Sequence, residues 1–206
     1  FTVSDKNLHV HDFVTEFIKT KVEEIKKVIG NSKAICALSG GVDSATAAVL
    51  TYKAIGNNLT CIYVDTGLMR IGETSQVQKT FGKLKIPLMV LNAKKQFLKA
   101  LKGVQDPEQK RIIIGHTFIK VLQGEALQMA SRKPGGEIKF LVQGTIYPDV
   151  IESKGTDHSH KIKTHHNVGG LPKKMNLKIL EPLRSLYKDQ VRELAVALGL
   201  PNEIVH

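Results

Sequence analysis

The segment best suited to chemistry in this 206-residue chain is 39–44, which reads Ser-Gly-Gly-Val-Asp-Ser. An apolar run precedes it and an alanine-rich run follows it, so the pattern predicts a tight turn between a strand and a helix. Adjacent glycines let the backbone approach a bound group, and the N–H groups of a helix's first turn favour phosphate oxygens. Ser39 and Ser44 add hydroxyl donors, and Asp43 places a carboxylate where a phosphate-bound magnesium ion can sit. The segment therefore predicts a phosphate-binding loop.

The spacing of this loop differs from the two common phosphate-binding fingerprints. A Walker loop has a longer interval between glycines and a Lys followed by Ser or Thr, and a dinucleotide fingerprint has three glycines in the pattern G-x-G-x-x-G. A glycine pair between a strand and a helix is also typical of α/β turns that bind nothing. Glycine alone leaves both interpretations open.

The charge of the chain favours anionic partners. Its 30 Lys and Arg exceed its 19 Asp and Glu, which gives a formal net charge of +11. Such an excess suits either nucleic acid or nucleoside triphosphates. Aromatic residues make up only 5% and Trp is absent, so stacking platforms for single strands are not apparent. We therefore favour a nucleotide over a polymer.

The two cysteines, Cys36 and Cys61, lie inside apolar runs and are expected to be buried free thiols in a reducing cytosol. There is no C-x-x-C pair, export signal or long apolar run, and we expect a cytoplasmic protein. The chain starts at Phe1 without an initiator Met and stops at His206, so we expect it to be a piece of a longer protein.

Strand-like and helix-like segments alternate along the chain, which predicts one α/β domain. The fold class is a mostly parallel, five-stranded twisted sheet with helices on both faces. A leading helix occupies residues 1–30. The strands are expected at 34–38, 59–64, 87–91, 138–143 and 178–182, and further helices at 45–54, 73–84, 94–101, 107–129 (interrupted by Gly115 and Gly124) and 187–198.

Polar residues follow the second and fourth strands, at the edge where α/β sheets bind ligands. Asp65 has the position of a ribose contact, but that role needs the glycine fingerprint that is absent here, so the pattern alone favours a cap or turn residue. For Arg70 the pattern alone favours a solvated loop charge over a ligand-binding role. Gly144 and Thr145 follow the fourth strand at the same edge.

Residues 146–170 form a polar stretch that is either disordered or functional, because long charged loops are uncommon in compact domains. His165 and His166 have no Cys partner, and neighbouring histidines point in different directions, which argues against zinc. We interpret the stretch as a lid that supplies cations to a polyphosphate.

Together, several motifs resemble the ATP pyrophosphatase domain of GMP synthase, a member of the N-type ATP pyrophosphatase superfamily with an adenine nucleotide alpha hydrolase-like fold. The loop is similar to the pyrophosphate-binding loop of that superfamily, which several activities share. The last two of the other motifs separate this family from NAD synthetases and tRNA-modifying relatives. These other motifs are 64–70, 106–115, 143–153 and 163–172.

The resemblance implies that ATP and Mg²⁺ adenylate XMP with release of pyrophosphate, and that ammonia then displaces AMP to give GMP. It also implies roles for individual residues. Catalytic roles fall to Asp43, Asp149, Glu152, Lys163, His165 and His166, nucleotide binding to Ser39, Gly40, Gly41, Val42, Asp43, Ser44, Val64, Gly144 and Thr145, substrate binding to Arg70 and Arg111, and magnesium binding to Asp43.

Members of this family obtain ammonia from a glutamine amidotransferase domain or subunit and dimerise through a small C-terminal domain. Neither domain is represented in residues 1–206, which correspond to the ATP pyrophosphatase domain alone. We expect a homodimer through the C-terminal domain, poor handling of XMP without it, and neither nucleic acid nor membrane as a partner. The alternatives are NAD synthetase, a tRNA-modifying enzyme, or a non-catalytic nucleotide-binding module.

Overall fold

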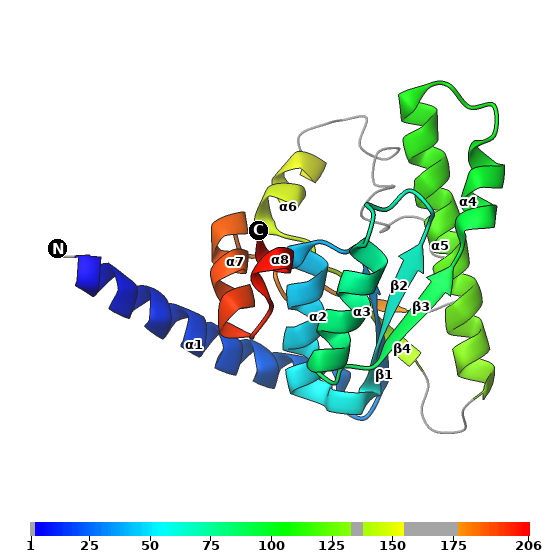
Figure 1. Ribbon diagram of the computed structural model, residues 1–206. Coiled ribbons are helices and arrows are strands. Elements are labelled where there is room, and N and C mark those ends of the chain that lie inside the picture. The colour runs from blue at the N-terminus through cyan, green and yellow to red at the C-terminus, as the bar shows by residue number, and fades with distance from the viewer. Residues whose placement is uncertain (1–2, 133–137, 155–176) are drawn as a thin grey trace.

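The structure is a computed structural model that describes residues 3–132, 138–154 and 177–206 (Figure 1). Its centre is a sheet of five parallel strands in the order β3-β2-β1-β4-β5. The predicted fold class is confirmed. The strands are β1 (Lys33–Leu38), β2 (Leu59–Asp65), β3 (Leu88–Asn92), β4 (Ile138–Val142) and β5 (Lys178–Leu180).

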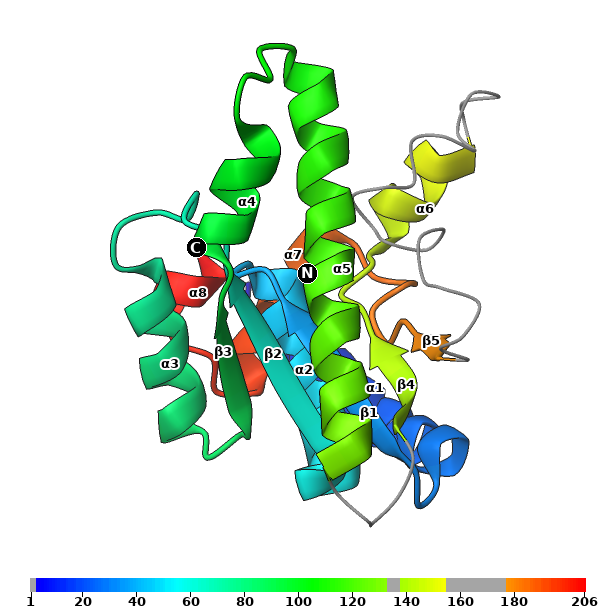
Figure 2. The ribbon, with the colours of Figure 1, turned by 90° about the vertical axis from the view of Figure 1, so that its right-hand side faces the viewer.

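Helices cover both faces of this sheet, and each face has its own apolar core (Figures 1 and 2). In strand β1, Cys36 packs into one core and Ile35 into the other. Because both faces of the strand are buried, its sequence is a continuous apolar run. One face carries α1 (Val3–Ile29), α2 (Val42–Ile55), α3 (Glu73–Lys83), α7 (Lys188–Ala197) and α8 (Asn202–Val205); the other carries α4 (Lys94–Leu101) and α5 (Pro107–Arg132).

The strand order reverses at β1. The chain runs from β1 outward to β2 and β3, and then crosses back so that β4 pairs with the other side of β1. In an open α/β sheet, the carboxyl ends of the two strands at such a reversal form a crevice that binds ligands. The loops after β1 and β4 therefore meet at the predicted phosphate site.

Three details differ from the sequence predictions. Helix α5 runs without interruption through Gly115 and Gly124, because Leu122 and Ala126 fix it against the sheet. Within the stretch 146–170, which was predicted as a charged loop, residues 147–154 form a helix, α6 (Tyr147–Lys154). The short helix α8 was not predicted. None of the described helices is long and apolar enough to cross a membrane.

Candidate functional site

The predicted phosphate loop lies between β1 and α2, and its turn is closed by one side chain. The Ser44 hydroxyl accepts a hydrogen bond from the Ser39 N–H at 3.2 Å and donates one to the Gly41 carbonyl at 3.1 Å. It also lies 3.1 Å from the Ser39 hydroxyl. The loop is thus held in shape by its own serines, and the first-turn amides of α2 are left at the helix N-terminus, where an anion is favoured.

Gly40 is required by the shape of this loop. Its φ of +82° lies in the left-handed region, and an added Cβ would overlap the Glu73 carboxylate. Glu73 also accepts hydrogen bonds from the Tyr63 hydroxyl at 3.2 Å and from the Arg70 N–H at 3.3 Å. Glu73, the first residue of α3, therefore packs against the phosphate loop and links it to Tyr63 of β2.

Burial raises the pKa of Tyr63 to about 12, and the nearby Glu73 carboxylate contributes further. The ring is fully buried at the end of β2. Tyr63 therefore stays protonated at neutral pH and acts as a hydrogen-bond donor to Glu73. Neither residue was recognised in the sequence, where Tyr63 reads only as a strand residue and Glu73 as a helix start.

Gly144 lies two residues beyond the end of β4 and close to the first turn of α2. A Cβ at this position would lie 2.6 Å from the Asp43 carbonyl carbon and 2.7 Å from the Ser44 nitrogen. Only glycine allows the two segments to approach so closely. The neighbouring Thr145 is buried, and among the described residues its hydroxyl has no hydrogen-bond partner. The end of β4 thus forms the second wall of the crevice.

Lys188 is a third residue of the site that the sequence did not reveal. Its Nζ lies 2.8 Å from both carboxylate oxygens of Asp43, although the two residues are 145 positions apart. Tyr187 precedes it as the N-cap of α7, and the Tyr187 N–H donates to the Gln190 side chain at 2.9 Å. The structure therefore places a lysine beside the loop from α7, where a Walker loop would carry one within itself. No local motif signals this contact.

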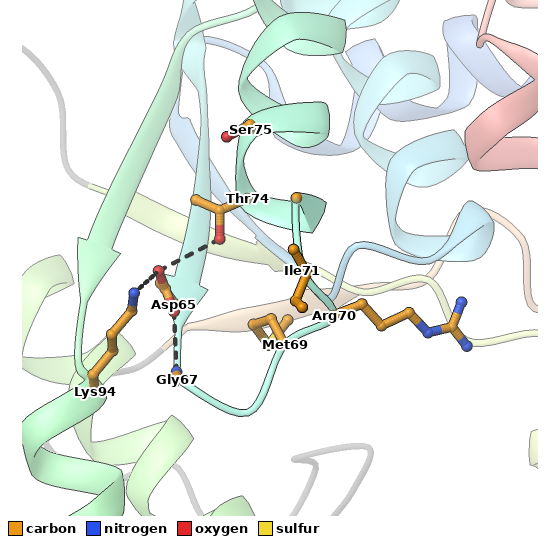
Figure 3. Close-up of a pocket in the computed structure, with 9 residues that line it drawn as sticks. Asp65, Gly67, Met69, Arg70, Ile71, Thr74, Ser75 and Lys94 are labelled. Atoms are coloured by element: carbon orange, nitrogen blue, oxygen red, sulfur yellow. Dashed lines mark hydrogen bonds and ion pairs between the residues drawn. The ribbon is translucent and has the colours of Figure 1, made fainter.

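The Asp65 carboxylate holds a turn. It accepts hydrogen bonds from the Gly67 N–H at 3.0 Å and from the Thr74 hydroxyl at 3.4 Å, and it pairs with Lys94 at 3.2 Å (Figure 3). The turn interpretation of Asp65 is thus the one the contacts support. These groups line a cavity of about 390 Å³ between the β2–α3 loop and the start of α4. Arg70 is exposed, and its side chain extends away from Asp65 and Lys94 (Figure 3).

The other residues that were predicted to form the site lie on several different elements. Asp149 accepts a hydrogen bond from the Ile146 N–H at 2.9 Å and so caps α6, while Glu152 on the same helix is exposed. Arg111 on α5 pairs with Glu108 at 2.6 Å. Val42 and Val64 are both buried in the apolar cores. Lys163, His165 and His166 lie outside the described residues.

A comparison with profiles of protein families identifies the family of the chain. The NAD synthase family profile matches residues 10–114, which is just over half of the chain and includes the phosphate loop, β2 and β3. The chain belongs to the NAD synthase family. The matched residues include β1, the phosphate loop and α2, but not β4, α6 or α7.

Among individual proteins, the chain is similar to several named GMP synthase [glutamine-hydrolyzing]. It is 54% identical to that of Aquifex aeolicus over 98% of this chain, and 56% identical to that of Carboxydothermus hydrogenoformans over 92%. These matches confirm the predicted resemblance to the ATP pyrophosphatase domain of GMP synthase. The chain spans only 38% and 36% of the length of these two relatives.

Solved structures share the fold at low sequence identity. The NH3-dependent NAD synthetase from Campylobacter jejuni matches with a TM-score of 0.70 and 15% identity, over 93% of this chain and 76% of that one. The NMN synthetase from Francisella tularensis matches with a TM-score of 0.64 and 17% identity, over 95% and 73%. At this identity the likeness concerns the fold alone.

Proposed function

We propose that the chain is the synthetase part of a GMP synthase, in which ATP drives the amination of XMP to GMP. The observation that carries this proposal is the identity of 54% to a GMP synthase over 98% of this chain. The phosphate loop at the strand-order reversal, with Asp43 and Lys188 beside it, supports the use of ATP.

In the first step, the 2-oxygen of XMP attacks the α-phosphorus of ATP. A bond forms between these two atoms, and the bond from the α-phosphorus to the bridging oxygen of the leaving pyrophosphate breaks. Negative charge grows on the pyrophosphate, so preorganised donors at that point lower the barrier. We assign this task to the amides at the start of α2 and to the loop residues 39–44.

The Asp43 carboxylate fits a magnesium ion. Mg²⁺ is commonly held by one or two carboxylates together with substrate phosphates, and the first turn of α2 provides such a carboxylate beside the predicted phosphate position. When bound, the ion neutralises charge on the phosphate oxygens. Among the described residues there is no cluster of three His, Cys, Asp or Glu side chains that could hold a metal without phosphate.

The walls of the crevice are assigned to the rest of the nucleotide. Gly144 and the Thr145 hydroxyl lie beside the nucleotide, and Val64 lies at the adenine pocket. Arg70 and Arg111 contribute positive charge for the substrates. For Asp149 and Glu152 on α6, and for Lys163, His165 and His166, we propose roles in organising adenylation and in excluding water from the adenylated purine.

In the second step, ammonia attacks the purine C2, and AMP leaves with the former xanthine oxygen. We propose that the ammonia comes from a glutaminase domain or subunit. Cys36 and Cys61 are the only cysteines of the chain, and both are completely buried. Neither thiol is placed to attack glutamine, which requires an accessible nucleophile.

The test is pyrophosphate release from ATP by the full-length protein, with ammonium chloride as the nitrogen source. We expect release to depend on XMP, and GMP and AMP to form in equal amounts. Release that responds to deamido-NAD or to tRNA instead would replace this function with that of a relative. No release with any acceptor would favour a nucleotide-binding module.

Variants at two positions test the residue assignments in the same assay. Asp43→Ala is expected to abolish most XMP-dependent release, because the proposed magnesium ligand is lost. Lys163→Ala is expected to lower kcat more than it weakens ATP binding, if its charge acts mainly in the transition state. Unchanged release by Asp43→Ala would remove Asp43 from the magnesium site.

A further inference from the structure

The Lys188 ammonium occupies the same carboxylate that the proposed function assigns to magnesium. Both Asp43 oxygens lie 2.8 Å from Nζ, so the ammonium bridges them symmetrically. A directly bound Mg²⁺ would lie about 2.0–2.1 Å from one of these oxygens. Two cations in contact with one carboxylate repel each other, and hence they compete for Asp43.

The backbone around Lys188 is held by hydrogen bonds, whereas its side chain is partly exposed. The Tyr187 N–H is bonded to Gln190, and the preceding Leu186 carbonyl accepts a hydrogen bond from the Tyr147 N–H at 2.9 Å. The Lys188 side chain itself is 43% exposed and carries its charge on a flexible four-carbon stem. A change of rotamer is therefore enough to withdraw the ammonium from Asp43.

A triphosphate offers each cation a new partner. Phosphate oxygens at the start of α2 would lie beside Asp43 and would accept charge-assisted hydrogen bonds from an ammonium. The metal alone offers Lys188 nothing in exchange for the carboxylate. The balance between the two cations thus changes only when nucleotide and metal arrive together.

We propose that Lys188 is an internal cation that blocks Asp43 until a metal–triphosphate complex displaces it onto the phosphates. Lys188 is in this sense a positioning residue, since its ammonium holds the Asp43 carboxylate in place and blocks its access to free divalent ions. The proposal rests on the magnesium role of Asp43 in the proposed function. It predicts that the protein binds a divalent ion poorly in the absence of nucleotide.

The chain offers a matched control in a second lysine–aspartate pair at the same edge of the sheet. Lys94 and Asp65 are 3.2 Å apart, and the Lys94 side chain is 50% exposed. Removing either lysine changes the net charge by the same amount. Asp65, however, keeps its hydrogen bonds from Gly67 and Thr74 and stays engaged in its turn.

The experiment measures Mn²⁺ binding to the full-length protein by electron paramagnetic resonance, with and without a non-hydrolysable ATP analogue. Without nucleotide, Lys188→Met is expected to bind Mn²⁺ roughly fivefold more tightly than the unmodified protein, the upper range for losing a half-exposed ion pair. Lys94→Met is expected to leave Mn²⁺ binding unchanged. Lys188→Arg retains the charge and is expected to keep Mn²⁺ binding weak.

Lys188→Met is expected to bind the ATP analogue more weakly than the unmodified protein. In the absence of nucleotide, adding Asp43→Asn to Lys188→Met is expected to abolish the gain in Mn²⁺ binding. Thermal unfolding verifies that each variant is folded. Unchanged Mn²⁺ binding in Lys188→Met, or an equal gain in Lys94→Met, would overturn the proposal. XMP-dependent pyrophosphate release is scored separately, so a failed blocking role is distinguishable from a failed GMP synthase function.

Discussion

Gly144 approaches the backbone of Asp43 so closely that a single methyl group there would lie 2.6 Å from the Asp43 carbonyl carbon. We predict that Gly144→Ala forces the end of β4 away from α2, with a loss of about 1–3 kcal/mol in the free energy of unfolding. ATP affinity is expected to fall as well, because the same shift widens the crevice. Urea denaturation and equilibrium binding of an ATP analogue measure the two effects.

The matched control for this variant is Gly124→Ala on α5, where an added Cβ has no neighbour within 4 Å. An alanine in a helix interior loses less backbone entropy than a glycine, so a gain of about 0.5–1 kcal/mol is expected. ATP affinity should not change. Equal destabilisation by both alanines would show that the contact with Asp43 is unimportant.

Thr145 carries a buried hydroxyl that has no partner among the described residues. We predict that Thr145→Val is neutral or stabilising by up to about 1 kcal/mol, because an unsatisfied buried polar group is removed. If the hydroxyl binds nucleotide, ATP affinity falls roughly fivefold to tenfold. Calorimetric titration and thermal unfolding separate these effects, and Thr145→Ser, which keeps the hydroxyl, should retain most of the affinity.

Because the pKa of Tyr63 is raised in the folded protein, we predict that the free energy of unfolding falls at alkaline pH. Its folded-state pKa is raised to about 12 from an ordinary value near 10, so the folded protein retains a proton that the unfolded chain loses. The contribution is complete below pH 10 and is lost as pH rises from about 10 to about 12, up to roughly 2–3 kcal/mol.

The check is urea denaturation of the unmodified protein and of Tyr63→Phe between pH 8 and pH 11. The variant lacks the titrating hydroxyl, and it also loses about 1 kcal/mol at pH 8 with the hydrogen bond to Glu73. Its stability should therefore fall less steeply above pH 10. Parallel curves for the two proteins would contradict the assigned pKa.

The cysteines predict a difference in thiol reactivity between the folded and unfolded states. Cys36 and Cys61 are opposite each other on β1 and β2, and both are fully buried. The pKa of Cys61 is raised by its contact with Cys36 and by burial, which reduces its thiolate fraction. We expect almost no reaction with an aromatic disulfide reagent in buffer and two equivalents in urea. Rapid labelling of the folded protein would contradict the burial.

The elements that position the phosphate loop could be predicted because their signals are local. The apolar run of β1, the glycine pair and the alanine-rich α2 specify a strand, a turn and a helix without reference to the rest of the chain. The start of α6 carried a local signal too, with Pro148 and Asp149 in its first turn. Because a long polar stretch follows, this helix was interpreted as part of a loop.

The contacts that complete the site could not be predicted, because they depend on how distant segments pack. Lys188 meets Asp43 only because α7 lies against α2, and Glu73 meets Gly40 only because α3 follows the neighbouring strand. No periodicity or motif encodes such pairings. Asp65 shows the opposite case, since the pattern alone favoured a cap or turn role and the hydrogen bonds support the turn.

The separation of Asp43 and Lys188 by 145 positions has a consequence for synthesis on the ribosome. The phosphate loop, α2 and the central strands leave the ribosome long before β4 and α7, so a nascent chain first carries an incomplete site with an uncompensated carboxylate. Only when α7 docks does Asp43 receive its lysine. A ligand that binds only the completed site would therefore stabilise the folded domain and not the intermediates that precede the docking of α7.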